Sequence, residues 1–267
     1  MTPWWTRTQR STQVFSFAQV HSTQAMAHEW IQDPSCATLL SDWVWIRALQ
    51  QSHGTGQRER LWLSPLGSCS GTLMLSFPYA HPLVSLVVSL SVAEAIEHAA
   101  SGTLRESITL KWPNDLMIKG HKLGGILTEV VEKNEMPPWI LIGIGININV
   151  SVSQLGSVAQ ERPITTLLEA CGTSFDLERL WERIHASLDH KLRALYWADT
   201  EAHCVADLNA RLLWIGETVW ARMGKKLFQG RFGGLYYNAR TQRTEMLLDD
   251  MTLPLSLRLG KCLEAVA

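Results

Sequence analysis

The stretch Ser107 to Val131, SITLKWPNDLMIKGHKLGGILTEVV, places two lysines, two turns and a glycine pair in consecutive strand-like segments. Pro113-Asn114-Asp115 and Lys119-Gly120-His121 predict the turns, because proline, glycine and asparagine favour turn backbone. Three β-prone segments remain: Ser107 to Trp112, Leu116 to Ile118 and Lys122 to Val131. The stretch therefore predicts two successive hairpins within one sheet.

Two lysines, Lys111 and Lys122, fall on neighbouring segments of these hairpins. Like charges on adjacent strands repel unless an anion lies between them or they point to opposite faces. A phosphate or a carboxylate would remove that cost. Each lysine taken alone is also compatible with an ordinary solvated strand residue. The Gly124-Gly125 pair indicates a place where another group approaches the backbone closely.

Composition narrows the possible functions. The chain has 267 residues and a net charge of -1 without a lysine or arginine run, which argues against nucleic-acid binding. Its five cysteines lie far apart, and no histidine pair has ligand spacing, so we expect neither a metal site nor a disulfide framework. No segment resembles a signal peptide or a membrane span. We expect a soluble protein of the reducing cytoplasm.

Two motifs carry a family resemblance. KWPND at Lys111 to Asp115, followed by KLGGIL at Lys122 to Leu127, closely resembles the signature of biotin protein ligases. The resemblance implies an α+β fold with a mixed, largely antiparallel sheet backed by helices, as in class II synthetases. It also implies a small C-terminal SH3-like β-barrel, with which the short β-like pieces after Asn209 agree. The expected domains are residues 1–207, catalytic, and residues 208–267, the small β domain.

Other elements follow from periodicity. Helices are expected at Ala25 to Ile31, Leu83 to Ala100, Arg162 to Cys171 and, capped by Ser174, Phe175 to Ala198. Strands are expected at Val44 to Leu49, Gly71 to Phe77 and Trp139 to Val150, with a turn at Asn134 to Pro138. Gly143 and Gly145 in the last strand again indicate close backbone approach.

Ser22-Thr23-Gln24 lies where the first helix begins. A plain N-cap explains Ser22 or Thr23, and a helix start can also bind a polar ligand group. The ligase family carries Ser-Thr-Asn here, facing the ureido ring of biotin. In this chain Gln24 is a longer amide than the family's asparagine.

The segment Gln50 to Trp62 is polar and carries two glycines, so it predicts a loop. It resembles the family's mobile biotin loop, GRGRxGR followed by tryptophan. Thr55 and Gln57 stand where that pattern has arginines, and Glu59 stands where it has glycine. Because guanidinium groups hold phosphate well, we expect weaker retention of the intermediate, with Arg58 and Arg60 taking over.

The resemblance implies a two-step reaction. Biotin and ATP form biotinyl-5'-AMP, and a lysine of a carboxyl carrier domain then displaces AMP, with Mg²⁺ accompanying ATP. The implied catalytic residues are Lys122, Lys111, Asp115 and Arg58, with Asp115 orienting the incoming amine; Asp115 is equally compatible with a plain turn residue. The implied biotin-binding residues are Ser22, Thr23, Gln24, Gln51, Thr55, Gly56, Gln57, Lys122 and Gly124. The implied ATP-binding residues are Arg58, Arg60, Trp62, Lys111, Asn114 and Asn147.

Three alternatives stay open. A lipoate-type ligase would use the same fold and activation chemistry, although Gln51 and Ser22-Thr23 favour a ureido head group. A weakly active biotin or adenylate sensor would fit the altered loop. A DNA-binding repressor is disfavoured, because fewer than about twenty residues precede the first expected catalytic strand and repressors of the family carry a winged-helix domain there. The sequence leaves open dimerisation through a sheet edge and the identity of the carboxylase.

Overall fold

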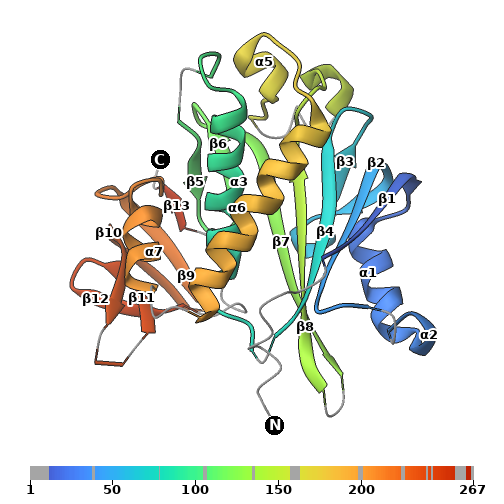
Figure 1. Ribbon diagram of the computed structural model, residues 1–267. Coiled ribbons are helices and arrows are strands. Elements are labelled where there is room, and N and C mark those ends of the chain that lie inside the picture. The colour runs from blue at the N-terminus through green and yellow to red at the C-terminus, as the bar shows by residue number, and fades with distance from the viewer. Residues whose placement is uncertain are drawn as a thin grey trace. The chain divides into compact units, whose positions relative to one another are not determined.

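The computed structural model describes residues 12–37, 40–77, 79–104, 107–133, 136–156, 163–197, 201–223, 226–238, 240–241, 243–255 and 263–265. Its contacts divide the chain into two units. Figure 1 labels the helices and strands. Unit 1 comprises Met1–Ala80 and Leu127–Val150, and unit 2 comprises His81–Ile126 and Ser151–Ala267. The expected boundary after residue 207 stays a prediction.

Unit 1 is a mixed sheet with helices. Its strands are β1 (Gln13–Val20), β2 (Trp43–Thr55), β3 (Leu61–Ser64), β4 (Cys69–Ser76), β8 (Met136–Ile146) and the second part of β7 (His121–Lys133). They follow the order β1-β2-β4-β8-β7, and β3 pairs with β2. Strand β1 runs parallel to β2, whereas β2–β4 and β4–β8 are antiparallel. Helix α1 (Thr23–Gln32) and the short α2 (Pro34–Ala37) follow β1.

The core of unit 1 lies between α1 and the sheet. Ala27 and Ile31 of α1 are fully buried against apolar residues of four strands: Val44, Ile46, Met74, Val131, Trp139 and Leu141. Burying an aliphatic side chain such as that of Ile31 contributes about 1.5–3 kcal/mol. This packing fixes the start of α1, and with it Ser22 to Gln24, over the sheet.

The expected loop at Gln50 to Trp62 is wrong over much of its length. Strand β2 continues to Thr55, because Gln50 and Gln51 pair with Gln19 and Val20 of β1. Partner strands satisfy a polar segment's backbone regardless of its local propensity. Only the five residues between β2 and β3 form the connection, which includes the 3₁₀ turn η2 (Gln57–Glu59).

Unit 2 contains the hairpins of the KWPND region. Strands β5 (Thr109–Lys111), β6 (Asp115–Ile118) and the first part of β7 form antiparallel ladders in that order. The two expected turns are confirmed, and Lys119 and Gly120 take left-handed backbone at φ 49° and 77°. The expected strand Trp139 to Val150 is shifted: β8 starts at Met136, includes Pro137 and Pro138, and ends at Ile146. The expected turn at Asn134 lies partly outside the described residues.

Helices of unit 2 are α3 (Val84–Ala99), α5 (Leu167–Cys171), α6 (Leu177–Trp197) and α7 (Glu201–Asn209), with a 3₁₀ turn η3 (Val152–Leu155). Helix α3 packs against α6 as well as β5 and β6, so it buries most of its surface and not one face alone. Asp176, not the expected Ser174, accepts the N–H groups of Glu178 and Arg179 at the start of α6.

No helix in the described part of the chain is long and apolar enough to cross a membrane.

The expected helix from Arg162 starts late. Arg162 lies outside the described residues, and Pro163 to Thr165 pair instead with β7. The Lys122 N–H donates to the Pro163 carbonyl at 2.8 Å, and the Thr165 N–H donates to the Lys122 carbonyl at 2.9 Å. Thr166 then caps α5 by accepting the Glu169 N–H. Both backbone groups of Lys122 are thus bonded to this segment, and β6 lies on its other side, where Met117 pairs with Lys122.

The C-terminal part of unit 2 is a five-stranded sheet in the order β12-β11-β10-β9-β13. Its strands are β9 (Thr218–Met223), β10 (Lys226–Asn238), β11 (Arg243–Leu248), β12 (Met251–Pro254) and β13 (Leu263–Ala265). The ladders are antiparallel, and a register shift between Phe232 and Gly234 bends β10. The α+β fold with a small C-terminal β part is confirmed.

Candidate active site

The start of α1 presents three buried polar residues. Ser22 caps the helix, since its Oγ accepts the Ala25 N–H at 3.4 Å. Thr23 and Gln24 are 3% and 5% exposed, respectively, which is unusual for polar side chains on a first helical turn. Their burial requires hydrogen-bond partners within unit 1.

Gln51 of β2 is one such partner. Its Oε1 lies 2.8 Å from the Thr23 amide nitrogen, which donates to it, and 3.1 Å from Thr23 Oγ1. Its Nε2 donates to Ser64 Oγ at 2.9 Å, and Ser70 lies within 2.9 Å of the same hydroxyl. The Gln51 amide is therefore fixed, with its oxygen toward α1.

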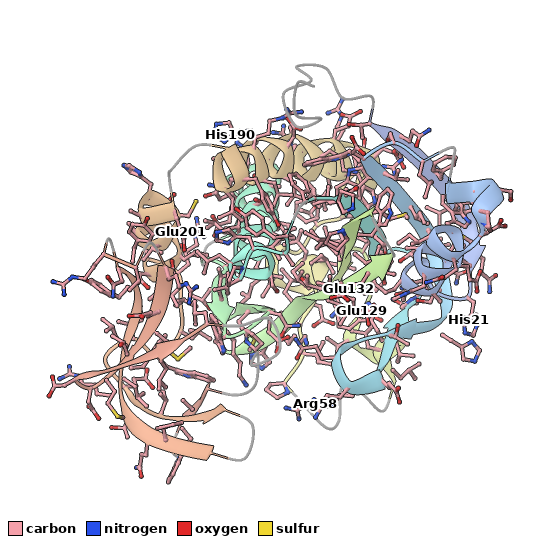
Figure 2. All side chains as sticks on the ribbon, turned by 90° about the horizontal axis from the view of Figure 1, so that it is seen from below. His21, Arg58, Glu129, Glu132, His190 and Glu201 are labelled. Carbon is pink, nitrogen blue, oxygen red and sulfur yellow. The ribbon has the colours of Figure 1, made fainter. Side chains whose placement is uncertain are left out.

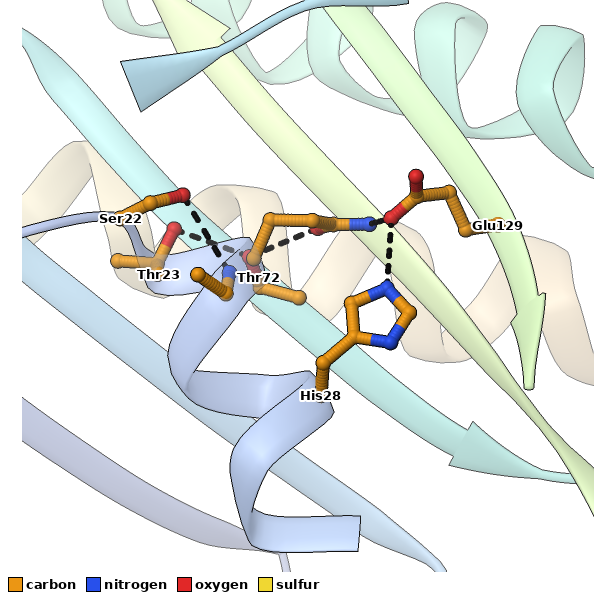
Figure 3. Close-up of polar contacts among 7 residues, drawn as sticks. Ser22, Thr23, His28, Thr72 and Glu129 are labelled. Carbon is orange, nitrogen blue, oxygen red and sulfur yellow. Dashed lines mark hydrogen bonds and ion pairs between the residues drawn. The ribbon is translucent and has the colours of Figure 1, made fainter. Parts of the chain in front are cut away.

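Gln24 reaches in the opposite direction, toward Glu129 of β7, and Figure 3 labels its neighbours Thr72, His28 and Glu129. Its Nε2 donates to Glu129 Oε2 of β7 at 2.7 Å, and its Oε1 lies 3.0 Å from Thr72 Oγ1 of β4. His28 Nε2 contacts the same Glu129 oxygen at 3.0 Å. A Cβ on Gly143 would lie 2.9 Å from Gln24 Oε1, so the glycine makes room for this long side chain.

Trp62 of β3 packs on a second glycine of β8. A Cβ on Gly145 would lie 2.6 Å from the indole ring, a distance that real contacts do not show. The expected close approach at both glycines of β8 is confirmed, and its causes are Gln24 at Gly143 and Trp62 at Gly145. Asn147, just beyond β8, is 3% exposed, and its role toward ATP stays a prediction.

The connection between β2 and β3 is exposed and strained. Arg58 and Glu59 have φ of 59° and 58°, left-handed values that side chains with a Cβ disfavour. Thr55, Gln57, Arg58 and Arg60 are all exposed, and Arg58 is labelled in Figure 2. The Gly56 N–H donates to the Arg60 carbonyl at 2.8 Å and closes the turn. The expected roles of these four side chains toward biotin and ATP stay predictions.

Unit 2 brings together three charged residues of the KWPND and KLGGIL motifs. Lys111 and Asp115 are directly paired across β5 and β6, so their side chains leave the sheet on the same face. Lys122 Nζ donates to Asp115 Oδ1 at 2.5 Å. The two lysines therefore share a face with a carboxylate and do not point to opposite sides of the sheet.

Gly125 and Asn114 shape this arrangement. A Cβ on Gly125 would lie 3.3 Å from Lys122 Nζ and 3.5 Å from Asp115 Oδ1, so the glycine keeps the pair in tight contact with the backbone. Asn114 Nδ2 donates to the Ile126 carbonyl at 2.5 Å, which ties the turn to β7. Gly124 is buried and pairs with Leu116.

Lys111 has an aromatic partner. Its Nζ lies 5.1 Å from the ring centroid of Trp214, a cation–π distance. Trp214 has φ of 71°, which is strained for a bulky residue. The preceding residues pair with β5, since the Leu110 N–H donates to the Arg211 carbonyl and the Leu213 N–H donates to the Leu110 carbonyl.

The sequence-predicted residues thus form two sets. Unit 1 brings together Thr23, Gln24 and Gln51, and unit 2 brings together Lys111, Asp115 and Lys122. Sequence reasoning missed Thr72, Glu129, His28 and Trp214 as neighbours of these sets. Glu129 was a usable signal in the sequence, because it lies on the same face of β7 as Leu127. A carboxylate on an otherwise apolar face needs a hydrogen-bond partner to offset the cost of its burial.

Comparison with known proteins decides the family. A family model described as biotin/lipoate A/B protein ligase matches residues 12–147, slightly more than half of the 267 residues. The chain belongs to the biotin/lipoate A/B protein ligase family. The matched region contains both sets of candidate site residues.

Curated relatives of this ligase family extend the likeness. The chain is 28% identical to the biotin–[acetyl-CoA-carboxylase] ligase of Paracoccus denitrificans over 203 residues, which is 73% of this chain and 82% of that protein. It is 27% identical to the bifunctional ligase/repressor BirA of Bacillus subtilis over 226 residues, which is 80% of this chain and 64% of that protein.

A solved structure of the ligase family has the same fold. The biotin protein ligase from Aquifex aeolicus in complex with biotin and ATP superposes with a TM-score of 0.75 at 24% identity. The match covers 95% of this chain and 99% of that chain.

Proposed function

We propose that the chain is a biotin protein ligase, which activates biotin with ATP as biotinyl-5'-AMP and transfers it to a lysine of a biotin carboxyl carrier domain. The family match carries the proposal, together with the paired amide and hydroxyl groups at the start of α1. A ureido ring offers two N–H donors and one carbonyl, and Gln51 Oε1, Thr23 and Ser22 offer complementary atoms. We propose that the reaction takes place in the cytoplasm.

In this proposal the charged set of unit 2 supplies the electrostatics. The biotin carboxylate attacks the α-phosphate of ATP, and the bond to the β-phosphate breaks so that pyrophosphate leaves. Negative charge builds on the α-phosphate during this step, and a preorganised ammonium group lowers that barrier. Lys122 holds this position because its backbone is fixed by Pro163 and Thr165, and its ammonium is aimed by Asp115. Lys111 adds a second positive charge toward the phosphates.

Asp115 is proposed to act again in the second step. Once AMP is the leaving group, the attacking carrier lysine must lose a proton, and a carboxylate beside the phosphate can accept or orient it. No covalent intermediate with the protein is needed.

Mg²⁺ is proposed to accompany ATP. Among the described residues no group of three or more histidine, cysteine, aspartate or glutamate side chains could form a cation cage. The donors proposed for Mg²⁺ are therefore mainly phosphate oxygens of ATP, which this ion commonly uses.

The decisive experiment compares acids. The protein is incubated with ATP, Mg²⁺ and either biotin or lipoate, and the acyl-adenylate is identified by mass spectrometry. A carrier domain is then added, and its mass is measured. Biotinyl-adenylate followed by a biotinylated carrier is the expected result. Formation of lipoyl-adenylate and no biotinyl-adenylate would indicate a lipoate ligase. Formation of biotinyl-adenylate without biotinylation of the carrier would indicate a sensor.

A further inference from the structure

Eight polar side chains of unit 1 form one continuous row of hydrogen-bond contacts. It ends at the contact between Glu129 of β7 and His28 of α1. In order, the row comprises Ser70, Ser64, Gln51, Thr23, Thr72, Gln24, Glu129 and His28. We refer to it as the polar row; its α1 end is drawn in Figure 3.

Glu129 sets the direction of the row. A carboxylate can only accept hydrogen bonds, so the Gln24 amide must point its Nε2 toward Glu129 Oε2, at 2.7 Å. Its Oε1 then faces Thr72 and must accept from that hydroxyl, at 3.0 Å. Gln24 is 5% exposed, so both ends of its amide need partners within the protein. The amide therefore has one orientation.

The middle of the polar row then has fewer hydroxyl protons than oxygen–oxygen contacts. Three oxygen–oxygen contacts join Gln51 Oε1, Thr23 Oγ1, Thr72 Oγ1 and Gln24 Oε1, at 3.1, 2.9 and 3.0 Å. Only the two threonine hydroxyls carry protons for them, because both amide oxygens are acceptors. Two protons cannot fill three contacts, so Thr23 Oγ1 or Gln51 Oε1, which also accepts the Thr23 N–H, keeps one acceptor position open. An N–H of a ligand can donate to that open position.

The opposite orientation of Gln24 would remove this shortage. With Nε2 toward Thr72, the amide would donate to Thr72, Thr72 to Thr23, and Thr23 to Gln51, so all three contacts would be filled without a ligand. The carboxylate of Glu129 prevents that arrangement. His28 Nε2, 3.0 Å from the same oxygen, helps to hold the carboxylate in place.

We propose that Glu129 is a positioning residue that keeps the polar row rich in acceptors and so selects acids whose head group carries N–H donors. This inference rests on the proposed function and deepens it: the preferred acids carry a ureido ring, and acids with a dithiolane ring are disfavoured. Glu129 acts through Gln24 and does not itself touch the reacting atoms.

The test uses Glu129→Gln, an amide of nearly the same shape that no longer fixes Gln24. The matched control is Glu132→Gln, an exposed glutamate three residues along the same strand; Figure 2 labels both glutamates. KM is measured for biotin, for desthiobiotin, which keeps the ureido ring, and for ATP by pyrophosphate exchange. Thermal melting of each variant checks that it is folded.

Glu129→Gln is expected to raise KM about tenfold for biotin and for desthiobiotin, as for loss of one hydrogen bond, with KM for ATP unchanged. Glu132→Gln should leave all three values unchanged. In a Gln24→Asn background, whose shorter amide falls short of β7, Glu129→Gln should have little further effect.

Equal changes in KM for biotin and ATP, an unchanged KM for biotin, or full additivity with Gln24→Asn would each overturn the inference. These results differ from a failure of the proposed function, which would appear as an absence of biotin-dependent exchange in the unmodified protein.

Discussion

Lys122 Nζ lies 2.5 Å from Asp115 Oδ1, and the two side chains are 21% and 23% exposed. Both belong to motifs that the family resemblance assigns to the reaction, yet one is expected to serve the first step and the other the second. Because they are paired, neither can be changed without altering the other's surroundings. Measuring adenylate formation and transfer to the carrier lysine separately distinguishes the role of Lys122 from that of Asp115.

Lys122→Ala should lower the rate of adenylate formation by at least about 2 kcal/mol of transition-state stabilisation, because one preorganised charge is lost. Single-turnover formation of biotinyl-5'-AMP measures it. Thermal melting checks that the variant is still folded, because Asp115 loses its charged partner. An unchanged single-turnover rate would remove Lys122 from the proposed mechanism.

Asp115→Asn should impair transfer to the carrier lysine more than adenylate formation. Loss of the carboxylate frees Lys122, which slows the first step, but the second step also loses a group that orients the incoming amine. The two steps are measured separately, the second with biotinyl-5'-AMP supplied directly. Equal losses would mean that Asp115 acts through Lys122 alone.

Glu59→Gly should stabilise the protein. Glu59 has φ of 58°, which glycine adopts without the steric cost of a Cβ, so the free energy of unfolding should rise by about 0.5–1 kcal/mol. Glu59→Ala is the matched control: it removes the same carboxylate but keeps the Cβ, and it should give no gain. Urea unfolding of the three proteins measures the difference, and equal stabilisation by alanine would point to charge as the cause.

Local chemistry explains which elements were predictable. Ser22 at a helix start, Lys119-Gly120 in a turn and Pro113-Asn114 between strands act through their own backbone, so sequence identifies them. Gln50 to Thr55 become strand because β1 and β3 lie on either side, a contact with residues far along the chain that local propensity does not encode. The helix α7 was missed for a related reason, since its hydrogen bonds to the C-terminal sheet hold it in place.

The candidate site shows the same division between residues that the sequence identifies and residues that only the structure reveals. Motif residues such as Lys122 and Gln51 were found through the family resemblance, whereas Glu129 and Trp214 were not, because their importance lies in what they contact. Glu129 matters in this structure because the Gln24 amide reaches β7 and donates to it. The longer amide of Gln24 departs from the family pattern, and Glu129 and Gly143 accommodate it by a hydrogen bond and by the absence of a Cβ.

The protein should lose stability in acid through Glu201. Burial raises the pKa of this carboxyl, but hydrogen bonds from His81 and Thr244 lower it by more, so its pKa lies below the ordinary 4.5. A lowered pKa in the folded state gives stability that is present above 4.5 and is lost as the pH falls through the folded value.

Glu201→Gln removes that contribution. The difference in free energy of unfolding between Glu201→Gln and the unmodified protein should be largest near neutral pH and should shrink below 4.5. Urea unfolding at a series of pH values measures it. A difference that grows in acid would contradict the sign of this pKa shift.

Trp214→Leu should raise KM for ATP about two- to tenfold while leaving KM for biotin unchanged, because Lys111 loses a cation–π contact that holds its ammonium group. The strained backbone at φ 71° indicates that the ring is kept in this position by its surroundings. Trp214→Phe retains an aromatic face and should restore much of the affinity for ATP, which a purely structural role would not require. Trp220→Leu, on β9 of the same unit, is the matched control. If leucine and phenylalanine at position 214 behave alike, Trp214 does not act on Lys111 through its π system.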